Sequence, residues 1–154
     1  LIQQPSYSML NRWVEEDGLV DTLEELGIGS IVFSPLAQGM LSTKYLNEIP
    51  DDSRASQHKS LNPDFLSEKN LANIKALNEI ALQRGQTLAQ MAIAWVLRKG
   101  RITSALIGAS RPEQVIDCAK AVDNLSFTDD ELERIDHYAT DAAINIWAKS
   151  AELG

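Results

Sequence analysis

The residue types that could do chemistry gather in one stretch of this 154-residue chain, from Ser34 to Arg54. An apolar run at residues 31–33 stops at Ser34 and Pro35, and the small residues that follow let the backbone approach another group closely. Lys44 and Arg54 supply positive charge in a chain whose formal net charge is −8. Cations beside small and hydroxyl residues at the end of a buried strand are suited to holding a phosphorylated cofactor. The alternative is a solvated loop in which both cations pair with neighbouring carboxylates.

A second candidate is Gln4, which shortly precedes Tyr7. A glutamine side chain carries a carbonyl and an NH2 group, so it can pair in both directions with a primary carboxamide such as that of nicotinamide. Tyr7 could then lie against the nicotinamide ring. The alternative is structural: Gln4 caps neighbouring backbone, and Tyr7 packs under a loop. The spacing alone leaves both interpretations open.

A third set of polar groups begins at Gly108 and Ser110, where the sequence predicts the start of a helix. Ser110 and Glu113 have the spacing of a capping box, in which the serine hydroxyl accepts from a backbone N–H group of the first turn. Helix N-termini carry unpaired N–H groups and partial positive charge, which favours a bound phosphate. Arg111 and Gln114 would lie near such a group, for example a ribose 2′-phosphate. An ordinary capped helix explains Ser110 and Glu113 equally well.

The elements that must position these residues alternate between strand and helix. Strands are predicted at residues 1–4, 30–33 and 102–107, and helices over 19–26, from 71 to near 85, and after capping boxes at Thr87, Ser110 and Thr128. Residues 37–63 show little periodicity, which predicts a long functional loop. The alternation predicts a parallel α/β sheet. Because a closed (β/α)8 barrel needs about 250 residues, we interpret residues 1–154 as the C-terminal portion of one TIM-type barrel domain, its last three β/α units.

Composition and charge argue against several other classes of protein. The acidic excess disfavours a nucleic-acid partner or an anionic membrane surface. No apolar run approaches the roughly 18 residues that cross a bilayer. The histidines and Cys118 do not have metal-ligand spacing, so no metal is expected. The lone Cys118 fits a cytoplasmic protein. We expect no secretory leader, and because the chain starts without Met inside a predicted strand, we expect it to be a fragment.

Several short motifs, in this order, resemble the aldo-keto reductase family over essentially the whole chain. They are Gln4-x-x-Tyr7, Ser34-Pro35-Leu36-Ala37-x-Gly39, Lys44-Tyr45, Ser53-Arg54-Ala55-Ser56, residues 88–95 and Gly108-Ala109-Ser110-x-x-Glu113-Gln114. The likeness is greatest to the branch that contains the voltage-gated potassium channel β subunits and bacterial L-glyceraldehyde 3-phosphate reductase. By this resemblance the fold is the (β/α)8 barrel and the cofactor is NADP(H).

The resemblance implies a set of cofactor-binding residues. The set is Gln4, Ser34, Pro35, Leu36, Gly39, Lys44, Arg54, Gly108, Ser110, Gln114 and Asp117. Gln4 holds the nicotinamide, while the stretch from Ser34 to Lys44 lines the pyrophosphate. Arg54 and the start of the helix after Gly108 surround the 2′-phosphate and the adenine.

Two positions depart from the family's pattern. Cys118 follows Asp117 where relatives often carry Asn, so the second adenine contact is in doubt. Ala109 stands where many relatives carry Lys or Arg, which leaves the NADP preference resting on Arg54 and Arg111.

The reaction implied by the resemblance is the reversible transfer of a hydride from NADPH to an aldehyde or ketone. Its catalytic Tyr, Lys, Asp and His or Asn are placed upstream of this chain, and no residue here matches them, so no catalytic residue is assigned. We expect the parent protein to reduce small aldehydes, such as L-glyceraldehyde 3-phosphate or methylglyoxal, and this segment alone to be inactive. The expected partners are the aldehyde, the N-terminal half of the same barrel and further copies of the protein. The alternative is a nicotinamide-binding regulatory subunit similar to the channel β subunits.

Overall fold

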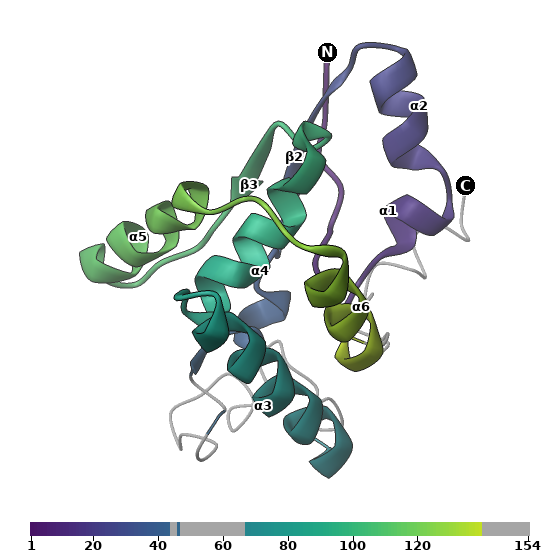
Figure 1. Ribbon diagram of the computed structural model, residues 1–154. Helices are drawn as coiled ribbons and strands as arrows, with labels where there is room; N and C mark the ends of the chain where they lie inside the picture. The colour runs from purple at the N-terminus through teal and green to yellow at the C-terminus, as the bar shows by residue number, and fades with distance from the viewer. Residues whose placement is uncertain (44–45, 47–66, 140–154) are drawn as a thin grey trace.

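The computed structural model describes residues 1–43, 46 and 67–139, and within them three strands lie parallel to one another (Figure 1). The strands are β1 (Ile2–Gln3), β2 (Gly29–Phe33) and β3 (Ser104–Leu106), in the order β1-β2-β3. Gln3 pairs with Ser30, and Phe33 pairs with Leu106. The parallel pairing expected from the alternating pattern is confirmed, although β3 is shorter than the apolar run at 102–107.

Helices follow each strand along the described part of the chain. They are α1 (Trp13–Glu16), α2 (Leu19–Glu25), α3 (Glu68–Gln83), α4 (Leu88–Leu97), α5 (Pro112–Ala119) and α6 (Asp129–Tyr138), with short 3-10 turns η1 (Ala37–Gly39), η4 (Arg98–Gly100) and η5 (Lys120–Asp123). Figure 1 shows α4 near the centre of the molecule, with α5 on one side and α6 on the other.

The central helix α4 is buried on almost all sides. Thr87 and Gln90 form the predicted capping box before it: Thr87 Oγ1 accepts from the Gln90 N–H group at 3.2 Å, and Gln90 Oε1 accepts from the Thr87 N–H group at 3.0 Å. The buried residues of the helix are Leu88, Gln90, Met91, Ala92, Ile93, Ala94, Trp95 and Val96. A helix that is apolar on nearly every face belongs in a core, and α4 lies there in contact with β3, α3 and α5.

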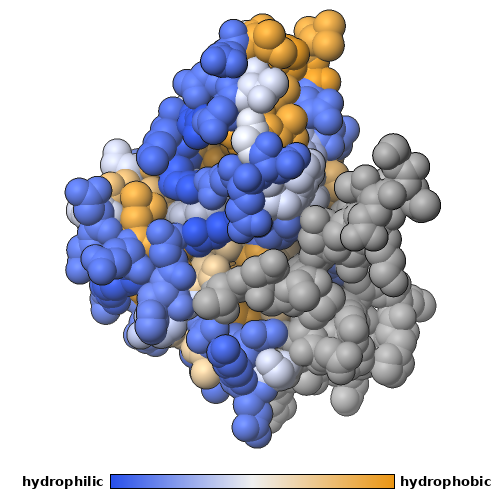
Figure 2. Space-filling model, turned by 90° about the vertical axis from the view of Figure 1, so that its right-hand side faces the viewer, coloured by the Kyte–Doolittle hydropathy of each residue, from blue (hydrophilic) through white to orange (hydrophobic). Residues whose placement is uncertain are grey.

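The described helices leave one face of the sheet open. Side chains alternate between the two faces of a strand, and Val32, on the helix-covered face, is fully buried. On the opposite face, Ile2 and Leu106 are 62% and 51% exposed. Figure 2 shows apolar surface at the upper end of the molecule, where Figure 1 places the N-terminus. In the described residues, β1 and β3 each have a strand partner on one side only.

Candidate functional site

The carboxyl ends of the three strands lie along one edge of the sheet, and an expected site residue occurs near each. The register of β1 and β2 continues past their last paired residues and places Gln4 level with Ile31, on the open face. Ser34 follows β2 directly, and Gly108 comes shortly after β3. Gln4, Ser34 and Gly108 are all exposed.

Backbone strain is concentrated in the turn that follows β2. Ser34, Ala37 and Gln38 have positive φ angles of 57°, 47° and 59°, a region that residues other than glycine rarely adopt. Hydrogen bonds from the Ala37 N–H group to the Ser34 carbonyl (2.9 Å) and from the Leu41 N–H group to the Leu36 carbonyl (3.1 Å) hold this conformation. Strained backbone of this kind clusters at ligand-binding sites. The turn is therefore the part of the described chain most suited to close contact with a ligand.

The remaining expected residues of this turn give it its shape. Pro35 is buried, and Leu36 and Gly39 are half-buried, with Gly39 at a φ of 97° that favours glycine. The carboxamide oxygen of Gln38 is buried and has no hydrogen-bond partner in the described residues. Gln38 was not expected from the sequence, because nothing in its neighbours signals that its side chain turns inward.

The start of α5 brings three hydrogen-bond donors to one oxygen atom. Gln114 Oε1 accepts from the Ser110 N–H group at 2.8 Å, from Ser110 Oγ at 3.2 Å and from the Arg111 N–H group at 3.2 Å. The expected capping box of Ser110 and Glu113 is wrong, since the helix begins one residue later, with Arg111 at the N-cap and Pro112 first in the helix. Proline favours that place because its fixed φ suits the helix and it has no N–H group to satisfy. Three donors that converge on one acceptor match the needs of a phosphate oxygen.

Asp117, one turn further along α5, faces α4. Its Oδ1 accepts from Gln90 Nε2 at 2.7 Å, and its Oδ2 accepts from Thr87 Oγ1 at 3.2 Å. The backbone carbonyl of Asp117 accepts a second bond from Gln90 Nε2 at 3.1 Å. The contact of Asp117 with adenine stays a prediction, whereas its contact with the capping box of α4 is present in the structure.

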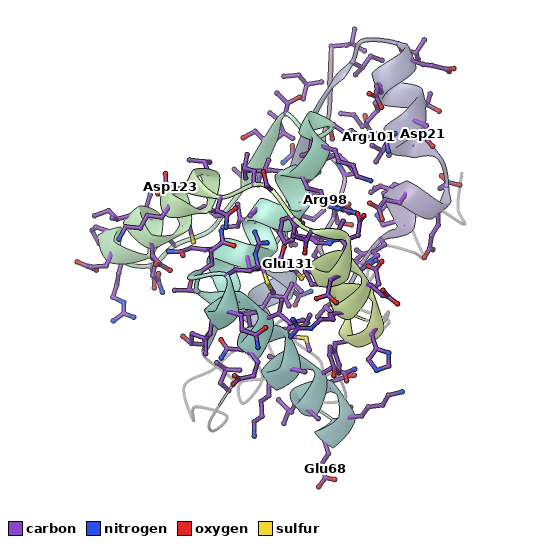
Figure 3. The ribbon with its side chains drawn as sticks, in the orientation of Figure 1. Asp21, Glu68, Arg98, Arg101, Asp123 and Glu131 are labelled. Atoms are coloured by element: carbon purple, nitrogen blue, oxygen red, sulfur yellow. The ribbon has the colours of Figure 1, made fainter. Side chains whose placement is uncertain are left out.

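Tyr7 lies in the core and not on the open face of the sheet. Its phenol donates to Glu15 Oε1 at 2.6 Å and accepts from Arg98 Nη1 at 2.9 Å, and its ring centroid is 5.4 Å from that of Trp95. Burial and the Glu15 carboxylate raise the pKa of Tyr7 above its usual range, although the Arg98 charge opposes them. Figure 3 shows Arg98 at the end of α4. The structural alternative for Tyr7 is therefore the one that the fold supports.

A groove of about 380 Å³ lies at the C-terminal end of α4. It is lined by Leu97, η4, residues 125–127 and Leu132, and none of the expected cofactor-binding residues contributes to it. Helices of a β/α unit run antiparallel to the strands, so this groove lies at the end of α4 away from the strand carboxyl ends.

Some expectations concern the rest of the chain. Lys44 and Arg54 lie outside the described residues. Across residues 1–43, 46 and 67–139, no group of three or more His, Cys, Asp and Glu side chains could hold a metal ion. None of the helices in these ranges has the length and apolar character needed to span a membrane.

Burial, and then the charge of Asp117, raise the pKa of the Cys118 thiol above its usual range.

Comparison with known proteins gives consistent matches along the chain. The model of the aldo/keto reductase family matches residues 1–140. L-glyceraldehyde 3-phosphate reductase of Escherichia coli is 50% identical over 156 residues, which cover 99% of this chain and 45% of that protein. A putative voltage-gated potassium channel subunit beta of Schizosaccharomyces pombe is 35% identical over 138 residues, which cover 86% of this chain and 40% of that protein. This chain thus spans less than half the length of these relatives.

Solved structures show the same fold. A glycerol dehydrogenase from Gluconobacter oxydans superposes with a TM-score of 0.72 at 30% identity, covering 89% of this chain and 41% of that one. A thermostable aldo-keto reductase superposes with a TM-score of 0.58 at 25% identity, covering 89% of this chain and 39% of that one. The similarity therefore extends to part of each of these structures and to nearly all of the present chain.

Proposed function

Because this chain belongs to the aldo/keto reductase family, we propose that it supplies the cofactor-binding side of an enzyme that reduces small aldehydes with NADPH. The observation that carries the proposal is the convergence of three donors on Gln114 Oε1 at the exposed start of α5. This arrangement follows the end of β3, and strand carboxyl ends are where β/α barrels place their active sites. The strained turn after β2 lies next to it along the same edge of the sheet.

The three strands are proposed to be the last three of an eight-stranded barrel, residues 1–154 being the C-terminal portion of that single domain. Parallel sheets are normally covered on both faces, but Ile2 and Leu106 are exposed on the face opposite the helices. Relatives more than twice as long are matched over less than half their length. A preceding half of the same barrel would pair with β1 and β3 and cover these side chains.

The residues of the strand ends fit a nicotinamide dinucleotide. The exposed Gln4 carboxamide can donate to and accept from the nicotinamide carboxamide. The turn formed by Ser34, Pro35, Leu36 and Gly39, together with Lys44, is assigned to the pyrophosphate. Its exposed serine and strained backbone suit close contact with phosphate oxygens.

The adenosine end is assigned to Arg54 and to the start of α5, from Gly108 to Gln114. A phosphate oxygen would take the donors of Ser110 and Arg111 that Gln114 Oε1 now accepts. When bound, NADPH supplies the hydride. This chain binds and orients the cofactor, and no catalytic residue is assigned within it.

The substrate class comes from the relatives. At 50% identity to a protein named L-glyceraldehyde 3-phosphate reductase, the present chain fits an enzyme for small aldehydes of that kind, and methylglyoxal is a second candidate. We assign the protein to the cytoplasm and expect a homo-oligomer, with no nucleic acid or membrane partner. The isolated segment is expected to be inactive, because the proton-donating residues are assigned to the preceding half.

NADPH titration by fluorescence tests the proposal in the full-length protein. The Arg54→Ala variant should bind NADPH roughly tenfold more weakly, the effect of losing a hydrogen bond to a charged group. Lys99→Ala is the matched control, because Lys99 is an exposed cation on η4, beside the groove and away from the strand ends. Equal NADPH affinity of the wild type and Arg54→Ala would remove Arg54 from the site.

A second candidate function is a nicotinamide-binding regulatory subunit. It is favoured by the 35% identity to a putative voltage-gated potassium channel subunit beta. Two measurements on the purified full-length protein distinguish the two candidate functions: whether a stable protein partner copurifies with it, and whether it reduces aldehydes. Efficient turnover by the protein alone rejects the regulatory alternative.

A further inference from the structure

We infer that Gln90 and Asp117 form a clamp that positions the start of α5, and that this clamp sets the preference for a cofactor with a 2′-phosphate. The inference rests on the proposed function. It makes Asp117 a positioning residue and not a ligand of the adenine.

The contacts of the clamp are partly buried, and the bond to the Asp117 carboxylate is short. The Gln90 side chain is 8% exposed, and its Nε2 group donates to Asp117 Oδ1 at 2.7 Å and to the Asp117 carbonyl at 3.1 Å. Thr87 Oγ1 adds a bond of 3.2 Å to Asp117 Oδ2. Hydrogen bonds with an ionised partner are among the stronger ones in proteins, so these three bonds tie α5 to the N-terminal end of α4.

The apolar contacts of α5 are few in comparison. Cys118 is the one buried residue of α5, and it packs with Ile93 and Ala121. Val115 and Ile116 are 50% and 61% exposed. In the described residues, the clamp is therefore a large part of what fixes the orientation of this helix.

The clamp lies one helical turn from the proposed phosphate site. Asp117 follows Gln114 by three positions, so the two residues are neighbours on the same helix. Any tilt of α5 about Asp117 moves the donors of Ser110 and Arg111, which must meet the phosphate within hydrogen-bond distance. The contacts made by Gln4 and by the turn after β2 lie on other elements, and a tilt of α5 leaves them in place.

Exchanging the two side-chain types provides the test. Gln90→Glu keeps an oxygen for the Thr87 N–H group, so the capping box survives, but it puts a carboxylate against Asp117. Asp117→Asn removes the negative charge and keeps one acceptor oxygen for Gln90 Nε2, but it turns the oxygen that accepts from Thr87 Oγ1 into an NH2 donor. The double variant restores one amide and one carboxylate in reversed positions, which can again form the bond. Asp123→Asn is the matched control, because Asp123 is an exposed carboxylate on η5, just after α5 (Figure 3).

Affinities for NADPH and NADH are measured by fluorescence titration of the full-length protein. Each single variant should bind NADPH roughly tenfold more weakly and NADH nearly as well as the wild type, and the double variant should regain NADPH affinity. Retained NADH binding shows that each variant is folded. Hydrogen exchange at residues 112–119 should rise in the single variants and return in the double variant.

The outcomes separate the explanations. If Asp117→Asn weakens the binding of both NADPH and NADH, and adding Gln90→Glu does not restore that binding, Asp117 contacts the adenine directly and the clamp is refuted. If the wild type binds NADPH and Gln90→Glu binds it equally well, the clamp alone is wrong. If the wild type binds neither dinucleotide, the proposed function is wrong, and the inference falls with it.

Discussion

Replacing Tyr7 with Phe removes one phenolic oxygen atom that makes two hydrogen bonds in the core. The phenol donates to Glu15 at 2.6 Å and accepts from Arg98 at 2.9 Å, and the residue is 2% exposed. Hydrogen bonds to charged groups contribute about 1.5–3 kcal/mol each. Arg98 and Glu15 stay paired at 2.7 Å without the phenol, so part of this is retained. We expect the free energy of unfolding of Tyr7→Phe to fall by about 2 kcal/mol.

The effect should depend on pH in a defined direction. Burial, together with the bond to Glu15, raises the pKa of Tyr7 above its ordinary value of 10.0. The folded protein therefore holds the phenolic proton more tightly than the unfolded chain does. This contribution is fully present below pH 10.0 and is lost as the pH rises beyond it. The stability difference between the wild type and Tyr7→Phe should shrink in that range.

Urea unfolding of the full-length protein, followed by tryptophan fluorescence, measures both effects. Tyr138→Phe on α6 serves as the control, because Tyr138 is only partly buried and its ring contacts His137. Tyr7→Phe as stable as the wild type at neutral pH would show that the phenol contributes nothing to the core. A stability difference that grows at alkaline pH would contradict the assigned sign of the pKa shift.

Two further predictions concern the helices. Arg84→Met should lower the free energy of unfolding by about 3–4 kcal/mol, because the Arg84 side chain is 2% exposed and pairs with Glu131 at 2.6 Å. Thermal unfolding measures this change. The control is Arg134→Met, which should lower the free energy of unfolding by under about 1 kcal/mol, because the Arg134 side chain is 38% exposed. Cys118 should react with a thiol reagent much more slowly in the folded protein than in urea, because burial and the Asp117 charge raise its pKa; equal rates in the two conditions would contradict that burial.

Features encoded by neighbouring residues could be predicted from the sequence. The capping boxes of Thr87 with Gln90 and of Thr128 with Glu131 are confirmed, because both partners lie within one turn. The strand at 30–33 is also confirmed, since an apolar run bounded by glycine and proline has few other solutions, but only Ser30 and Val32, on one face, are buried in the structure. The parallel order of the strands followed from the alternation of elements.

Features that join distant residues could not be predicted in this way. Arg98 and Glu15 are 83 positions apart, and nothing near Tyr7 indicates that they meet at its phenol. Gln90 was expected only as a cap, because its second role depends on where α5 packs. The left-handed turn at Ser34 has no local signal either, since serine gives no sign of a positive φ. Each of these arrangements depends on tertiary packing.

The two ends of α4 have different roles, which explains why the core and the candidate site can be perturbed separately. At its N-terminal end, Gln90 binds Asp117 of α5, and at its C-terminal end Arg98 binds Glu15 of α1. The buried residues between them make the helix a rigid spacer. Loss of the Arg98 contacts removes stability while leaving the start of α5 in place, whereas loss of the Gln90 contact moves α5 while leaving the core packed. Substitutions at the Arg98 end should therefore change the urea midpoint, and substitutions at the Gln90 end should change the choice between NADPH and NADH.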